Sequence, residues 1–192
     1  EQGKMYLADY SYGNFTTAYE MGSTVKGATL LTGYREGAVS VGEAQIDEPI
    51  VLGKGLVKSS IFNRGGRIRM NDLMALEQSS NVYMFKIALS MGGLSYYPYM
   101  ATASLLKDDT LNRLRNGYAQ VGLGVPTGID LPGETIGVIG VPDSPGKVLD
   151  ITIGQYDTYT PMQLVQYVST IANGGYRVQP RLLKEIRKPS KD

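Results

Sequence analysis

Histidine and cysteine are both absent from this sequence of 192 residues, and tryptophan is absent as well. Without cysteine, disulfides, thiolate nucleophiles and zinc–sulfur sites are excluded. Without histidine, a Ser-His-Asp hydrolase and a histidine-ligated metal are excluded. Any general base must therefore be Lys, Asp, Glu or Tyr. The sequence also lacks an apolar run of about 18 residues, so nothing in it predicts a membrane-spanning helix.

The charges nearly cancel, because 19 Lys and Arg stand against 18 Asp and Glu. This balance argues against a nucleic-acid partner, which needs a basic face. A hydrophobic share of 42% and a charged share of 19% are typical of a globular domain. The polar start, Glu1-Gln2-Gly3-Lys4, is not a signal peptide. We interpret the abrupt ends as those of a piece of a longer protein.

Apolar spacing and capping residues predict mainly helices. One is expected from Ser23 to Arg35, and two segments from Asn71 to Gly92 separated by Ser79-Ser80-Asn81. Others are expected at Thr110–Val121 and after Thr160, where Pro161 and Gln163 suggest a capping box. Short strands are expected at Val39–Val41, Ile50–Leu52 and Tyr176–Val178, and a long loop over 122–158.

A serine activated by a lysine is the natural chemistry for such a composition. Ser-x-x-Lys places both side chains on one face of a helix, and a buried lysine can lose its proton near neutral pH. Three matches occur, at Ser23–Lys26, Ser104–Lys107 and Ser144–Lys147. Because Pro and Gly lie inside the third, we expect no helical turn there. Asp108 and Asp109 would keep Lys107 charged, so Ser23 and Lys26 are the favoured pair. Any single match can equally be a solvated lysine near a capping serine.

The only Ser-x-Asn in the chain is Ser79-Ser80-Asn81. Read alone, it can be a simple polar break between two helical segments. If the link is extended, alternate residues point to one side, so Ser79 and Asn81 would both face a cleft. A hydroxyl and an amide there could relay a proton and hold a substrate carbonyl.

These residues resemble the first two active-site motifs of the penicillin-binding proteins and serine β-lactamases. The segments Tyr19–Lys26 and Gln78–Asn81 carry that likeness, and Gly122–Glu134, Ile153–Gln155 and Thr160–Gly175 are similar to class B penicillin-binding proteins. Val25–Thr29 and Gly154–Asp157 look like the division-associated subgroup. The resemblance implies an α+β transpeptidase fold. Residues 1–192 would be a partial domain, mainly its helical subdomain with most of the central sheet missing.

The resemblance also implies roles. Ser23 would be the acyl-forming nucleophile of a peptidoglycan D,D-transpeptidase, and Lys26 its general base. Ser79 would relay a proton, and Asn81 would contact the acyl-side amide. Stem peptides ending in D-Ala-D-Ala and β-lactam antibiotics would be the ligands, with no metal or cofactor. The parent protein would work with divisome proteins on the extracytoplasmic face of the cell membrane, anchored by an N-terminal helix outside this chain.

Two other functions stay open. A β-lactamase or β-lactam sensor would need a deacylating base, for which Glu134 lies in a suitable loop but carries no distinguishing mark. A non-catalytic helical interaction module, for example a dimer pairing through an exposed apolar surface, would need no chemistry at all.

The family's third motif, Lys-Thr/Ser-Gly, is missing, since Lys58-Ser59-Ser60 fails at its last position. That motif supplies one oxyanion donor, whose loss costs about 10²–10³ in rate. We therefore expect that this chain alone cannot turn over substrate, and that labelled penicillin gives no adduct on Ser23 at normal rates by intact-mass spectrometry. A stable adduct formed at rates normal for the family would contradict this expectation.

Overall fold

The computed structural model describes residues 9–106 and 109–188. The helices in it are α1 (Gly13–Thr16), α2 (Lys26–Arg35), α3 (Asp72–Glu77), α4 (Asn81–Met91), α5 (Thr110–Gln120), α6 (Pro145–Ile151) and α7 (Pro161–Ala172). Short 3₁₀ helices are η1 (Gly22–Val25), η2 (Gly53–Gly55) and η3 (Ala103–Leu106). The strands are β1 (Gln45–Asp47), β2 (Ile50–Leu52), β3 (Leu56–Lys58) and β4 (Ile68–Met70).

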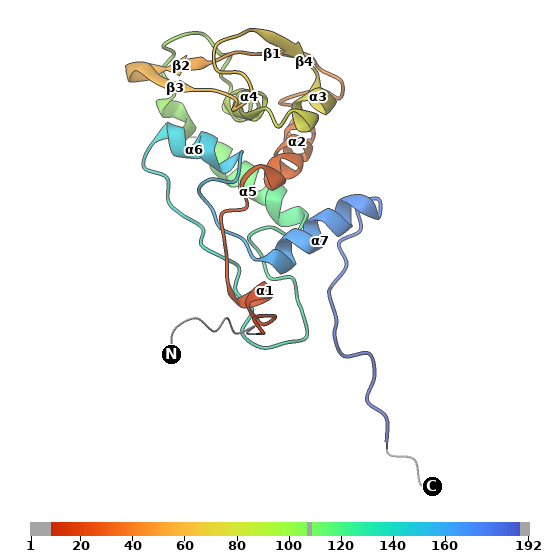
Figure 1. Cartoon of the computed structure of the whole chain (residues 1–192). Helices are drawn as coiled ribbons and strands as arrows, with labels where there is room; N and C mark the ends of the chain where they lie inside the picture. The colour runs from red at the N-terminus through yellow and green to blue at the C-terminus, as the bar shows by residue number, and fades with distance from the viewer. Residues whose placement is uncertain (1–8, 107–108, 189–192) are drawn as a thin grey trace, which may run out of the picture.

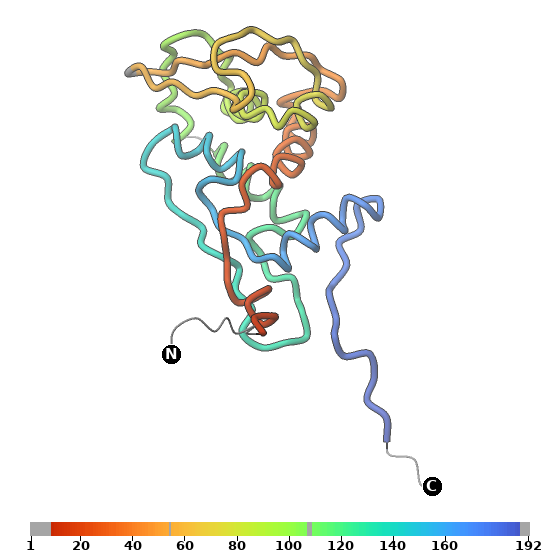
Figure 2. The backbone as a smooth tube through the Cα atoms, in the orientation of Figure 1, coloured from red at the N-terminus to blue at the C-terminus, as the bar shows by residue number. Residues whose placement is uncertain are grey.

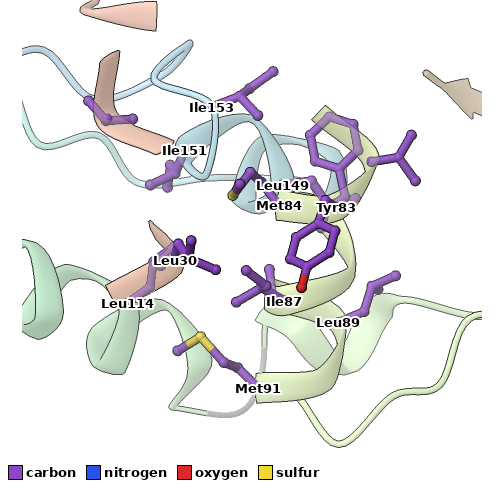
Figure 3. Packing of buried hydrophobic residues seen from close by; sticks show 14 of the residues in the cluster. Leu30, Tyr83, Met84, Ile87, Leu89, Met91, Leu114, Leu149, Ile151 and Ile153 are labelled. Atoms are coloured by element: carbon purple, nitrogen blue, oxygen red, sulfur yellow. The ribbon is translucent and has the colours of Figure 1, made fainter. Parts of the chain in front are cut away.

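Helix α4 lies at the centre of the core because it is apolar around most of its circumference. Tyr83, Met84 and Ile87 are almost completely buried and face residues from α2, α5 and α6 (Figure 3). A helix that is apolar on nearly every side must be surrounded by other elements. The strands lie along one side of α4, and α2, α5 and α6 lie on the other (Figure 1).

Two small antiparallel sheets form within the described chain. In one, β1 pairs with β4, so that Gln45 lies opposite Met70. In the other, β2 pairs with β3, so that Ile50 lies opposite Lys58. This pairing brings the segment that follows β3 close to the start of α4, where Ser60 contacts Asn81.

Helices α2 and α5 approach closely because a glycine lies at their crossing. A Cβ on Gly117 of α5 would lie 2.1 Å from Oγ1 of Thr32 on α2. Thr32 is buried, and its hydroxyl donates to the carbonyl of Ala28 at 2.7 Å, so it has little freedom to move aside. This crossing helps to hold the first turns of α2 in place.

Most of the expected helices are confirmed, including the capping box of α7, in which Thr160 and Gln163 bond each other's backbone. The prediction that Ser144–Lys147 forms no helical turn was wrong, because α6 begins there with Pro145 in its first turn. Proline lacks only an N–H that the first turn leaves unpaired anyway, and so it starts a helix well. Helix α1 was also missed.

Two of the three strand predictions were wrong. Residues Val39–Val41 form a bend and a turn, and Tyr176–Val178 carry no strand pairing, whereas Ile50–Leu52 is confirmed as β2. After α7 the chain runs away from the helices as an extended segment (Figure 2). None of the helices in the described ranges is long and apolar enough to cross a membrane.

Replacing Gly117 with alanine should lower the free energy of unfolding. The overpacking penalty of about 1–3 kcal/mol opposes a gain in helix propensity of about 1 kcal/mol, so we expect a net loss of up to about 2 kcal/mol. Gly65→Ala is the matched control, because a Cβ there meets nothing within 4 Å. Equal thermal unfolding midpoints for the two variants would show that the crossing tolerates a methyl group.

Candidate active site

Ser23 lies in the 3₁₀ turn η1, directly before α2, and its side chain is exposed. Residues i and i+3 of a 3₁₀ turn eclipse one another, so Ser23 and Lys26 lie along the same side of the chain. The amide of Lys26 donates to the carbonyl of Ser23 and fixes this turn. Within the described ranges the Ser23 hydroxyl makes no hydrogen bond, so it is not committed to a structural partner.

The turn that carries Ser23 is supported from behind by Gly154. Gly22, with φ of 55°, donates to the Gly154 carbonyl at 3.0 Å. A Cβ on Gly154 would lie 2.3 Å from the Gly22 carbonyl oxygen, and φ of Gly154 is itself 72°. Only glycine satisfies both conditions, which gives a physical reason for glycine within Ile153-Gly154-Gln155.

Lys26 is the first residue of α2, and only 2% of it is exposed. Its Nζ lies 2.7 Å from the Ser79 carbonyl, 2.9 Å from Ser79 Oγ and 2.7 Å from Asn81 Oδ1. The carbonyl and the amide oxygen can only accept. A neutral amine can donate its two N–H groups to them and turn its lone pair toward the Ser79 hydroxyl.

Burial lowers the pKa of Lys26 to about 8, because water is withdrawn from the charged form. The carboxylate of Asp47 opposes this shift and keeps the pKa from falling further. Below this value the amine is charged, and above it the amine is a base. A lysine with such a pKa can accept a proton much closer to neutral pH than an exposed lysine can.

The Ser79–Asn81 link is not extended as expected. Ser79 has a left-handed φ of 55° at the end of α3, and Asn81 is already the first residue of α4. Both side chains nevertheless reach Lys26, because the sharp reversal at Ser79 turns its hydroxyl and its carbonyl to the same amine. The structure thus brings three of the four predicted site residues into direct contact, and Ser23 lies one turn before them.

The Ser144–Lys147 match does not form such a site. Ser144 is the N-cap of α6, and Lys147 pairs with Asp143 at 2.8 Å, which raises the pKa of Lys147. Lys107 lies outside the described residues. The described ranges also hold no cluster of three or more Asp or Glu side chains suited to a metal ion.

Sequence reasoning missed the buried polar residues behind Lys26. Asp47 is 1% exposed and binds the side chains of Ser60, Asn63 and Ser80. No motif marks Asp47 or Ser60. The only available signal was a carboxylate between two apolar residues, Ile46 and Ile50, in a stretch that we expected to be mostly loop.

Comparisons with known proteins identify the family of this chain. The family model of the penicillin binding protein transpeptidase domain matches residues 1–192. Penicillin-binding protein H of Bacillus subtilis strain 168 is 51% identical over 186 residues, which are 96% of this chain and 26% of that protein. The structure of penicillin-binding protein 2B from Streptococcus pneumoniae strain R6 is 38% identical, with a TM-score of 0.86, and the match covers 92% of this chain and 29% of that one.

The chain therefore belongs to the penicillin-binding protein transpeptidase domain family. Within that family it is part of a class B penicillin-binding protein, and the expected transpeptidase fold is confirmed. Its two small sheets are consistent with a partial domain. The chain spans about a quarter of the length of the curated relatives that it matches, 26% for penicillin-binding protein H.

We expect the Lys26 amine to titrate near pH 8, well below an exposed lysine. NMR of ¹³C-labelled lysine side chains should resolve this titration, with Lys147 as the control because its pKa is raised by Asp143. The Asn81→Leu variant should lower the Lys26 pKa further, since it removes an acceptor that favours the charged form. A Lys26 signal that titrates together with Lys147 would mean that the amine is hydrated.

Proposed function

We propose that this chain carries the nucleophile and the general base of a serine D,D-transpeptidase that cross-links peptidoglycan. The observation that carries the proposal is the buried Lys26 amine, held by Ser79 and Asn81 one turn after an uncommitted Ser23 hydroxyl. Burying an amine that has no carboxylate in contact with it costs stability, so a purely structural lysine would gain nothing from it. The burial is explained if the neutral amine has a chemical role.

In the proposed acylation step, neutral Lys26 takes the proton of Ser23 as its oxygen attacks the carbonyl of the penultimate D-Ala. A new C–O bond forms, and the C–N bond to the terminal D-Ala breaks. The proton reaches the departing amine through the Ser79 hydroxyl, which already touches Lys26 Nζ. The acyl group then passes to an amine of a second stem peptide, and Ser23 regains its proton.

The charge that develops on the carbonyl oxygen needs two N–H donors. We propose that the backbone N–H of Ser23 supplies one. The second would come from a Lys-Thr/Ser-Gly motif elsewhere in the parent protein. Asn81 holds the amine through Oδ1, and its proposed contact with the acyl-side amide of the substrate would use the remaining surface of its side chain.

A β-lactam would acylate Ser23 in the same way, because its strained amide presents the same carbonyl. The rival function, hydrolysis of that adduct, needs a free carboxylate near Ser23. Glu134 does not offer one, since it accepts hydrogen bonds from the amide and hydroxyl of Thr127 at 2.7 and 2.5 Å and from the amide of Gly128 at 3.2 Å. This engagement supports a transpeptidase over a β-lactamase or a β-lactam sensor.

The other rival, a helical interaction module, is favoured by one observation. Helix α7 exposes Val165, Val168 and Ile171 along one face. Such a face also suits the central sheet of a complete transpeptidase domain, and a module would have no use for the buried amine. We propose further that the parent protein is anchored in the cell membrane, acts on its outer side and works with division proteins.

Ser23→Ala in the complete parent protein should abolish covalent labelling by fluorescent penicillin, because the acylated oxygen is lost. Ser144→Ala is the matched control, since it removes the serine of another Ser-x-x-Lys and should leave labelling unchanged. Labelling can be measured by gel fluorescence and by peptide mass spectrometry. Persistent labelling of Ser23→Ala would refute the proposed nucleophile, and rapid release of the adduct would favour a hydrolase.

A further inference from the structure

A buried polar cluster lies directly behind the contacts of Lys26. We call it the Asp47 cluster; its members are Asp47, Ser60, Asn63 and Ser80. Asn63 Nδ2 donates to Asp47 Oδ1 at 2.9 Å, which leaves Oδ2 for the two serines. Ser60 donates to Oδ2 at 2.5 Å, and Ser80 donates to the same oxygen. The members come from β1, from the segment after β3 and from the α3–α4 link.

Ser60 uses its whole hydrogen-bonding capacity within this cluster. Its hydroxyl donates to Asp47 and accepts from the backbone amides of Asn81, at 2.9 Å, and Val82, at 3.2 Å. Those amides open α4 and have no partner within the helix. Ser60 is completely buried, so water cannot replace it. Its hydroxyl therefore fixes where the backbone of Asn81 lies.

Ser59, the residue before Ser60, fixes the orientation of the Asn81 side chain. The Ser59 carbonyl accepts from Asn81 Nδ2 at 3.2 Å. With the NH₂ group held there, Oδ1 must face the opposite way, toward Lys26 Nζ at 2.7 Å. The Ser59–Ser60 segment thus holds both the backbone and the side-chain amide of Asn81. Asn81 in turn holds the amine of Lys26.

We propose that Ser60, anchored by Asp47, is a positioning residue for acyl transfer at Ser23, acting through Asn81 on the amine of Lys26. It touches neither Ser23 nor the proposed path of the proton. The inference rests on the proposed function, because without acyl transfer there is nothing to position. A serine suits this place since one small hydroxyl can serve one acceptor and two donors at once.

The test uses the complete parent protein and a labelled penicillin. Stopped-flow labelling separates the affinity of the non-covalent complex, the first-order rate constant of acylation and the fraction of protein labelled at completion. For Ser60→Ala we expect that rate constant to fall about 10- to 100-fold, because a misplacement of about 1 Å can cost about 100-fold in rate. The affinity and the labelled fraction should stay near those of the wild type.

Thr160→Ala is the matched structural control. Thr160 is also a completely buried hydroxyl that caps a helix, but it lies at the start of α7 and has no contact with the Asp47 cluster. It should lower the unfolding temperature and leave the acylation rate constant unchanged. If Ser60→Ala does not fold, Ser60→Cys serves instead, since a thiol fills the same space but bonds weakly. Its rate constant should then fall at least about threefold, in keeping with a weakened hydrogen bond.

An unchanged rate constant in every Ser60 variant that folds overturns the inference, whether or not the labelled fraction drops. A smaller labelled fraction with a normal rate constant means that Ser60 only stabilises the fold, which also overturns it. If the wild-type parent is not labelled, or if Ser23→Ala still is, the proposed function fails as well. Slow acylation with full labelling, found for Ser60 variants and not for Thr160→Ala, supports the inference.

Discussion

Burial of the Lys26 amine is the constraint on which the rest of this structure depends. An amine removed from water must either lose its charge or find acceptors, and this one has three oxygens from two residues within 2.9 Å. Supplying them requires the end of α3, the start of α4 and the first turn of α2 to meet at one point. The apolar surface of α4 provides the force for this meeting, since α2 and α6 bury their own apolar residues against it.

Polar groups at the site are satisfied in successive layers. Lys26 is held by Ser79 and Asn81, Asn81 by Ser59 and Ser60, and Ser60 by Asp47. Lys26, Ser60 and Asp47 are all buried, so the position of the amine is determined by the packed interior. Ser23, by contrast, is supported only through its backbone, by the close approach of Gly22 and Gly154. That arrangement leaves its hydroxyl available for chemistry.

The motifs predicted which residues meet, and the helices followed from apolar spacing and caps such as Asn71 and Thr160. The conformation of the Ser79–Asn81 link could not be predicted, because only tertiary contacts hold a serine at positive φ. Asp47 and Ser60 could not be predicted for a related reason, since they lie 13 residues apart and are brought together by the pairing of β2 with β3 between them. Strands of three residues are too short to show a periodic pattern. Helix α6 was not predicted because Pro145 was interpreted as a helix breaker.

The left-handed backbone of Ser79 has an evolutionary consequence. Glycine would adopt this conformation without strain, but it would remove the hydroxyl that touches Lys26. Selection for a more robust fold and selection for the contact between this hydroxyl and Lys26 therefore favour different residues at this position. A redesign of the domain guided by stability alone would choose glycine here and produce a more stable protein without the hydroxyl that contacts Lys26.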